Sequence, residues 1–145
     1  MKKLLLILLF LSSPLQAEVY DIQQFNLNNF KGKVVYLDFW ASWCKPCQVS
    51  FPWMNSIKNK YADKDFTIVT INLDENPDAM HQFLSKVKAD FDVYHDPSGE
   101  FAEKFKVEGM PTSYLIDKTG KPVKKHIGFY LKKTPQYEQE IEALL

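Results

Sequence analysis

The chain has 145 residues, of which 46% are hydrophobic, and it carries 18 acidic and 18 basic residues. This length suits one domain, and the hydrophobic content is too high for a disordered chain. Arginine is absent from the sequence, which argues against recognition of nucleic acid or phosphate, because arginine side chains are usually prominent in such sites.

The N-terminal segment predicts an exported protein. Two lysines follow the initial Met, an unbroken apolar run occupies 4–11, and the segment ends in the small residue Ala17. This is the layout of a secretory signal peptide, and the run is too short to span a membrane. We therefore expect a signal peptide at 1–17 and a mature domain at 18–145, with a net charge of −2. The expected location is the periplasm or another exported compartment, with membrane tethering only if the leader is retained.

The rest of the chain predicts an α/β fold, in which a mixed central β-sheet is flanked by helices on both faces. An irregular lead-in or edge strand is expected at 18–30. Runs rich in β-branched and aromatic residues predict strands at 34–40, 66–73, 91–96, 112–117 and 122–127. Helical spacing of apolar residues predicts helices at 44–61, 77–87, 100–105 and 134–145. Pro52 should kink the first helix, and Thr134 should cap the last.

Both cysteines, Cys44 and Cys47, lie in the stretch DFWASWCKPCQVSFPW. A purely structural disulfide across so short a loop would add little stability. A tetrahedral zinc site needs about four ligands, and the three histidines are scattered along the chain without ligand spacing. Redox chemistry is therefore the strongest interpretation of the pair.

The predicted positions assign different tasks to the two cysteines. Cys44 should be exposed at the start of a helix, where free N–H groups, the helix dipole and neighbouring Lys45 favour its thiolate. Cys47 should lie one turn further in, so Cys44 is expected to attack and Cys47 to resolve the mixed disulfide. Asp38 interrupts the apolar strand before the motif. Burial should raise its pKa and make it a proton acceptor for Cys47, the alternative being a polar residue that caps the strand end.

A second informative stretch is GMPT, which precedes the strand predicted at 112–117. A proline here could simply break the chain in a loop. In this context we expect a cis bond between Met110 and Pro111, which would leave neighbouring backbone groups free to bind an extended substrate.

Taken together, these motifs resemble the thioredoxin superfamily. The resemblance rests on VVYLDFWASWCKPC, on Pro52 five residues after the second cysteine, and on INLDENP, GMPT and YLIDKTGKPV. The leader and the long stretch between Asn72 and Pro111 are similar to the exported TlpA/ResA-like branch. The resemblance implies a thioredoxin-like fold and a thiol–disulfide oxidoreductase that generally works as a reductant. It implies no metal and no cofactor beyond the redox-active Cys44–Cys47 disulfide.

The resemblance also implies further site residues and partners. Glu75 stands where that branch often carries an active-site glutamate; the alternative is a solvated loop carboxylate. Asp38 stands where many members have Asn, which leaves open which acid handles the proton. The residues implied to contact substrate are Trp43, Lys45, Pro46, Gly109, Met110 and Pro111. Implied partners are client proteins with cysteines, such as apocytochrome c or copper-site proteins, and a membrane thiol donor of the DsbD/CcdA type.

Two other functions are compatible with the same residues. An exported oxidase or isomerase of disulfides would use the same cysteine pair at a more oxidising potential. A client- or copper-binding protein would use the Met-Pro segment or the two thiolates without turnover, since soft thiolates suit Cu(I).

Overall fold

The computed structural model of the chain describes residues 17–145, so the predicted signal peptide lies outside the described residues apart from Ala17. Within this part, six strands form one mixed sheet in the order β1-β4-β3-β2-β5-β6. The strands are β1 (Val19–Asp21), β2 (Val34–Trp40), β3 (Phe66–Asn72), β4 (Asp92–His95), β5 (Thr112–Ile116) and β6 (Pro122–Ile127). The α/β fold with a mixed sheet is thereby confirmed, and the lead-in contains an edge strand.

Strand β2 lies at the centre of the sheet, and all seven of its residues are buried. It pairs in parallel with β3 and antiparallel with β5. A strand covered on both faces needs apolar side chains at nearly every position, which explains why VVYLDFW reads as an unbroken apolar run apart from Asp38. The β5–β6 hairpin then adds the antiparallel edge that the sequence predicted.

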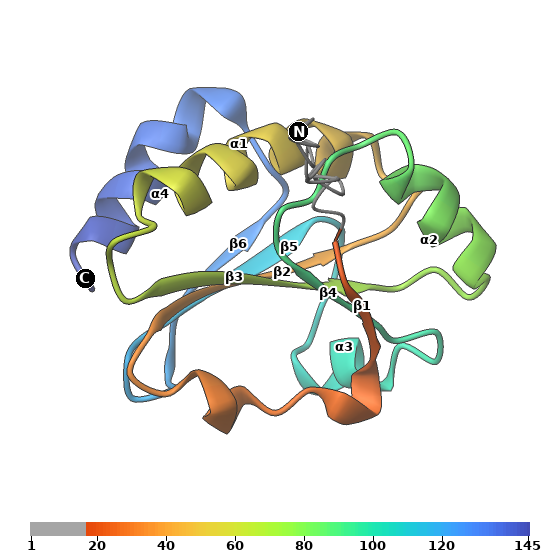
Figure 1. Ribbon diagram of the computed structural model, residues 1–145, viewed down its shortest axis with the longest axis horizontal. Helices are drawn as coiled ribbons and strands as arrows, with labels where there is room; N and C mark the ends of the chain where they lie inside the picture. Colours follow the sequence, from red (N-terminus) through yellow and green to blue (C-terminus); the bar gives the residue numbers. More distant parts are fainter. Residues whose placement is uncertain (1–16) are drawn as a thin grey trace, which may run out of the picture.

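Between residues 17 and 145, four α-helices cover the sheet: α1 (Lys45–Lys60), α2 (Pro77–Leu84), α3 (Glu100–Lys104) and α4 (Thr134–Glu142). Figure 1 shows α1 and α4 on one face of the sheet and α3 on the opposite face. Side chains from α1, α2 and α4 pack into one hydrophobic cluster, and those of α3 pack into a second with the segment that follows β1. None of the helices in the described part of the chain combines the length and apolar character needed to cross a bilayer.

The alternation of side chains along β2 assigns each residue to one of these two layers. Tyr36 and Trp40 belong to the cluster that contains α1, whereas Leu37 and Phe39 belong to the cluster that contains α3. Because strand side chains alternate with a period of two, Asp38 shares the α1 face with Tyr36 and Trp40. The one carboxyl group of this strand therefore faces the helix that follows the cysteine motif.

Two local predictions about helix ends were wrong. Thr134 does not cap α4: it is the first helical residue, Lys133 precedes it at the cap, and the Thr134 hydroxyl donates to the carbonyl of Leu131 at 2.9 Å. The helix predicted at 77–87 ends at Leu84. Val87 still packs against the core from the turn that follows, and this burial explains its apolar character.

Candidate active site

The two cysteines form a disulfide at the start of α1, with an S–S distance of 2.09 Å and Cα atoms 5.3 Å apart. Cys44 is the N-cap residue and Pro46 lies in the first turn, as its missing N–H allows. The backbone N–H of Cys47 donates to the sulfur of Cys44 across 3.3 Å. The predicted strand–turn–helix setting of the motif is confirmed, and a helical N–H group contacts the first sulfur.

The exposure of the pair differs from the prediction. Cys44 is only 4% exposed and Cys47 is fully buried, so the expectation that Cys44 is exposed was wrong, although it is the more accessible of the two. Both pack in the hydrophobic cluster beneath α1, and Met110 from the loop before β5 packs against that cluster. Trp43, by contrast, is 70% exposed, so the side chain immediately before Cys44 is accessible to a partner.

Asp38 is 2% exposed, and its Oδ2 atom has no hydrogen-bond partner within residues 17–145. In the neighbouring strands it is paired with Thr70 and Ser113, but these hydroxyls contact other groups. Trp40 Nε1 donates to the Thr70 hydroxyl at 3.2 Å, and the Tyr36 hydroxyl donates to Ser113 at 2.9 Å. Burial raises the pKa of the Asp38 carboxyl well above its ordinary value. The site thus contains a buried acid with an unoccupied acceptor atom.

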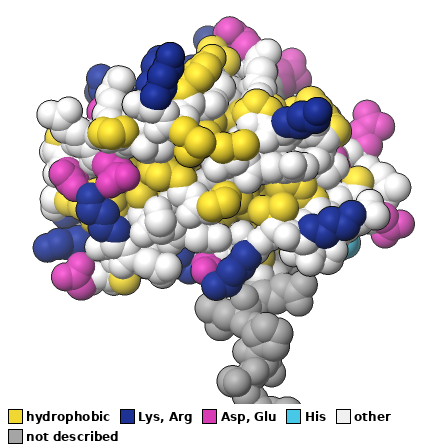
Figure 2. Space-filling view, turned by 90° about the horizontal axis from the view of Figure 1, so that it is seen from above, with side chains coloured by type: hydrophobic (Ala, Val, Ile, Leu, Met, Phe, Trp, Pro, Cys, Tyr) yellow, Lys and Arg dark blue, Asp and Glu magenta, His cyan; other side chains and the backbone are white. Residues whose placement is uncertain are grey.

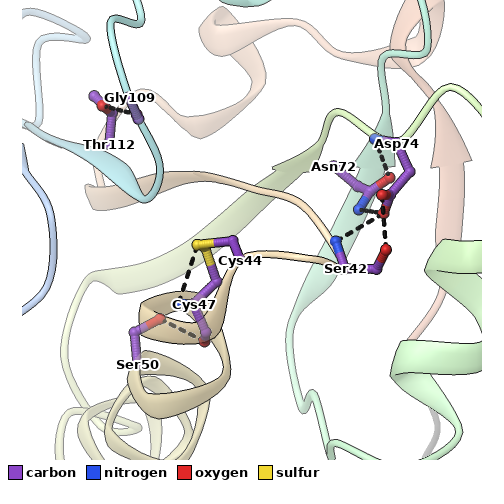
Figure 3. The surroundings of a disulfide bond; sticks show 8 residues. All are labelled: Ser42, Cys44, Cys47, Ser50, Asn72, Asp74, Gly109 and Thr112. Carbon is purple, nitrogen blue, oxygen red and sulfur yellow. Dashed lines mark hydrogen bonds between the residues drawn. A yellow bond between two sulfur atoms is a disulfide. The ribbon is translucent and has the colours of Figure 1, made fainter.

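A second buried carboxylate, Asp74, lies just after β3 and was missed by the sequence reasoning. It accepts hydrogen bonds from the backbone N–H and the hydroxyl of Ser42, at 2.9 and 2.8 Å, and from the side-chain amide of Asn72 at 2.7 Å. Figure 3 shows Ser42 turned toward Asp74 and Asn72 and away from the disulfide. Its neighbour Glu75, which the sequence singled out, is an exposed residue of the bend between β3 and α2.

The GMPT segment lies where the sequence predicted it. The Met110–Pro111 bond is cis, which confirms that prediction. The Thr112 hydroxyl donates to the carbonyl of Gly109 at 2.6 Å, and the Pro111 carbonyl accepts from the backbone N–H of Gly128 at 2.8 Å. The first bond joins the two ends of the segment, the second links the segment to Gly128, and the Met110 side chain packs against the cluster that holds the cysteines.

An apolar groove of about 560 Å³ includes part of the cysteine motif in its lining. It is lined by Lys45, Pro46, Val49, Phe129, Tyr130, Leu131 and Lys132. Tyr130 is 50% exposed and Leu131 is 62% exposed, although both are large hydrophobic side chains. Figure 2 shows hydrophobic side chains gathered on the face that carries α1 and α4, with lysines around them. Such an exposed apolar surface is typical of a protein-binding site.

Comparison with known proteins agrees with this geometry. A family model described as Redoxin matches residues 15–141. The chain belongs to the Redoxin family. It is 38% identical over 119 residues to the thiol-disulfide oxidoreductase ResA of Bacillus thuringiensis, a match that covers 77% of this chain and 69% of the relative. ResA of Bacillus cereus is 38% identical over 123 residues, covering 85% of this chain and 68% of the relative.

Solved structures show the same fold as this Redoxin-family chain. A Chlorobium tepidum protein, provisionally assigned as thiol:disulfide interchange protein DsbE, has 47% identity and a TM-score of 0.80, covering 81% of this chain and 84% of that one. The exposed lipoprotein thioredoxin of Streptococcus pneumoniae has 35% identity and a TM-score of 0.71, covering 83% and 91%. The thioredoxin-like fold is confirmed, and the chain is a thiol–disulfide oxidoreductase with Cys44–Cys47 as its redox pair.

Four of the residues that the sequence selected lie on the same side of the sheet in this redoxin. Cys44, Cys47 and Asp38 share the α1 side of the sheet, and Met110 packs against the same cluster. The implied substrate contacts diverge: Lys45 and Pro46 line the apolar groove, whereas Trp43 lines a separate groove of about 300 Å³ beside α2. The available signal for Tyr130 and Leu131 was the apolar FYL triplet between Gly128 and two lysines. Among residues 17–145, no three His, Cys, Asp or Glu side chains cluster as metal ligands would.

Proposed function

We propose that the chain is an exported dithiol reductase in which Cys44 attacks client disulfides and Cys47 resolves the resulting mixed disulfide. The observation that carries this proposal is the N–H of Cys47 donating to the sulfur of Cys44 in the first turn of α1. That contact and the helix dipole stabilise negative charge on Cys44, the more accessible of the two sulfurs.

The exchange proceeds in two steps, attack on the client disulfide and resolution of the mixed disulfide. The Cys44 thiolate attacks one sulfur of the client disulfide, and a Cys44–client bond forms as the client's other sulfur leaves as a thiolate. Cys47 then loses its proton and attacks Cys44, which closes the Cys44–Cys47 disulfide and releases the second client thiolate. Two electrons pass to the client, and an external dithiol must return two electrons to the oxidised pair before the next turnover.

Asp38 is the proposed acceptor of the Cys47 proton. Its side chain lies on the face of β2 that packs under α1, and its Oδ2 atom has no partner within the described residues. Because burial raises the pKa of Asp38, its carboxylate is a stronger base than an exposed carboxylate and accepts a proton near neutral pH more readily. Glu75 remains a prediction as a second proton carrier, and because its side chain is exposed, its proposed task is proton exchange with solvent.

The proposed direction, partners and location draw on the relatives. Relatives named ResA thiol-disulfide oxidoreductase and DsbE interchange protein support a redox exchange with client proteins. We propose cysteines of apocytochrome c or of copper-site proteins as clients, and a membrane thiol protein of the DsbD/CcdA type as donor. The Lys45-Pro46 pair between the cysteines resembles that of reductants. The pneumococcal relative is named an exposed lipoprotein, which supports export of this chain.

The apolar groove is the proposed seat for the client chain. Lys45 and Pro46, the two residues that follow Cys44, belong to its lining, so a client segment in the groove would lie close to the motif. The exposed side chains of Val49, Tyr130 and Leu131 would be covered by such a segment, which supplies the hydrophobic part of the affinity.

The deciding experiment measures the reduction of a protein disulfide, that of insulin, by the reduced chain and by its Cys44→Ser variant. We expect rapid reduction by the wild type and none by the variant. Equilibration with glutathione buffers then separates a reductant from an oxidase, because about 30 mV corresponds to a tenfold change in the two-electron equilibrium. Equal rates for the two proteins, or a potential as oxidising as that of DsbA, about −120 mV, would contradict the proposal.

A further inference from the structure

Hydrogen bonds connect the loop between β2 and α1, which carries Cys44, to the end of β3. The Trp40 carbonyl accepts from the backbone N–H of Leu73 at 2.9 Å. Two residues after Trp40 and one residue after Leu73, both the N–H and the hydroxyl of Ser42 donate to the Asp74 carboxylate. Cys44 follows Ser42 by two residues, so these bonds fix the segment immediately ahead of the reactive sulfur.

Asp74 is itself held firmly. Its carboxylate accepts from the Asn72 amide at 2.7 Å, its backbone N–H donates to the Asn72 side-chain oxygen at 3.0 Å, and its carbonyl is 2.7 Å from His95 Nε2. The residue is 5% exposed. Figure 3 shows the resulting group of Ser42, Asn72 and Asp74 on the side of the loop away from the disulfide. A buried carboxylate that accepts three hydrogen bonds is a rigid anchor.

We propose that Asp74 is a positioning residue for thiol–disulfide exchange, acting through Ser42 to hold Cys44 at the N-cap of α1. The inference rests on the proposed function, in which Cys44 is the attacking sulfur. The contact that depends on this placement is the Cys47 N–H to Cys44 sulfur bond of 3.3 Å. Hydrogen bonds weaken steeply with misalignment, so a loop released from Asp74 loses part of the stabilisation of the Cys44 thiolate.

Asp74 could affect the Cys44 thiolate in two ways, by positioning the loop or by its negative charge. The two effects change the pH of thiolate formation in opposite directions, so an experiment can separate them. Removing a carboxylate near a thiol favours the thiolate and lowers the pH at which it forms. Releasing the loop disfavours the thiolate and raises that pH. A substitution of Asp74 that raises the pH of thiolate formation therefore reports on placement and not on charge.

The experiment is the pH dependence of iodoacetamide alkylation at Cys44 in a Cys47→Ala background, with and without Asp74→Ala. Residue 47 keeps its backbone N–H in both proteins. We expect Asp74→Ala to raise the pH midpoint of alkylation by about half a unit or more, which lowers the thiolate fraction near pH 7 about threefold. An unchanged or lowered midpoint would overturn the proposal.

Asp96 provides the matched control. It is also a buried carboxylate, 1% exposed, and it accepts from the backbone N–H groups of Phe101 and Ala102 at the start of α3. It follows the neighbouring strand β4, but its bonds lead to the opposite face of the sheet. Asp96→Ala should lower the unfolding temperature and leave the alkylation midpoint where it was. A midpoint shift as large as that of Asp74→Ala would show a general loss of structure and overturn the specific role.

Ser42→Ala tests the path and covers the case in which Asp74→Ala fails to fold. It removes the hydroxyl bond and keeps the N–H bond, so we expect a smaller shift in the same direction. The double variant should shift no further than Asp74→Ala alone, because Asp74 acts through Ser42; additive shifts would overturn the proposal. If Cys44 in the background protein titrates like a free cysteine, near pH 8.5, the proposed function itself fails, and that result is distinct from any effect of Asp74.

Discussion

The backbone N–H of Cys47 donates to the sulfur of Cys44 across 3.3 Å, inside the motif whose sulfurs also form the disulfide. The same turn of helix thus positions the second sulfur and stabilises charge on the first. Asp38 lies on the face of β2 that packs against α1, and its Oδ2 atom has no hydrogen-bond partner among residues 17–145. The proposed function thus assigns attack, resolution and proton removal to separate residues, which makes each step testable by itself.

Asp38→Asn should slow the resolution step and spare the first attack. The amide keeps the size of the side chain but cannot accept the Cys47 proton, and the loss of a general base typically costs a factor of about 100 or more. Stopped-flow measurements of mixed-disulfide formation and decay separate the two steps, and the difference should be largest near neutral pH. Unchanged decay kinetics would remove Asp38 from the mechanism.

The same substitution should stabilise the protein at high pH. The raised pKa of Asp38 means that the folded protein favours the neutral acid. The stability contributed by protonated Asp38 is therefore fully present below the unfolded pKa near 3.8, and it is lost as the pH rises through the pKa of Asp38 in the folded protein. The Asn side chain of the variant cannot ionise. The free energy of unfolding of Asp38→Asn relative to wild type should therefore grow with pH, by about 1.4 kcal/mol for each pH unit that separates the folded and unfolded pKa values.

Urea unfolding of the oxidised protein at pH 4, 7 and 9 measures this advantage. Disulfide-intact protein is used throughout so that the redox state does not change with pH. A difference between Asp38→Asn and wild type that stays constant from pH 4 to pH 9 would contradict a buried, ionisable Asp38.

Leu131→Ser should weaken client binding. Leu131 is 62% exposed in the apolar groove. Complete burial of a Leu side chain contributes about 1.5–3 kcal/mol, and a bound client would bury part of it. Loss of this contact should raise the KM for insulin about threefold to tenfold. Its kcat should stay the same, and reduction of a small aromatic disulfide should be unaffected. Val123→Ser is the control, because Val123 is an exposed hydrophobic residue of β6, 38% exposed and outside the groove. Equal effects of the two variants on KM would exclude the groove.

Phe51→Ala should destabilise the fold by about 3–5 kcal/mol. Phe51 is fully buried, and its ring lies 4.9 Å from Trp40, 5.1 Å from Phe83 and 5.3 Å from Phe91, measured between ring centroids. These contacts anchor α1, and with it the cysteine motif, on the sheet. Urea unfolding measures the loss; a change below about 1 kcal/mol would show that α1 is held elsewhere.

The strands were predictable from the sequence because their signals are local. The run at β2 is apolar since both faces of a central strand are covered, and the apolar run at β3 has the same cause. Helix ends were less predictable: Val87 follows the apolar spacing of α2 but packs on the core from a turn. Periodicity records which face is buried, and it does not record where the backbone leaves the helix.

In the site, the residues inside a compact motif were predictable and those joined across the chain were not. Their spacing and their neighbouring residues identify Cys44, Cys47 and the proline of GMPT in the sequence. Asp74 acts through bonds to Ser42, 32 positions away, and no periodic pattern marks such a pair. The burial of Cys44 likewise depends on tertiary packing around it, including Met110 from a distant loop, so local sequence suggested an exposed residue.

The most direct test of the central claim is to trap the mixed disulfide with a disulfide-bonded client in Cys47→Ser and in Cys44→Ser, and to locate the linked cysteine by mass spectrometry. We expect a stable adduct on Cys44 in the Cys47→Ser protein and none on Cys47 in the Cys44→Ser protein. Adducts that form on Cys47 as fast as on Cys44 would contradict the assignment of Cys44 as the attacking sulfur.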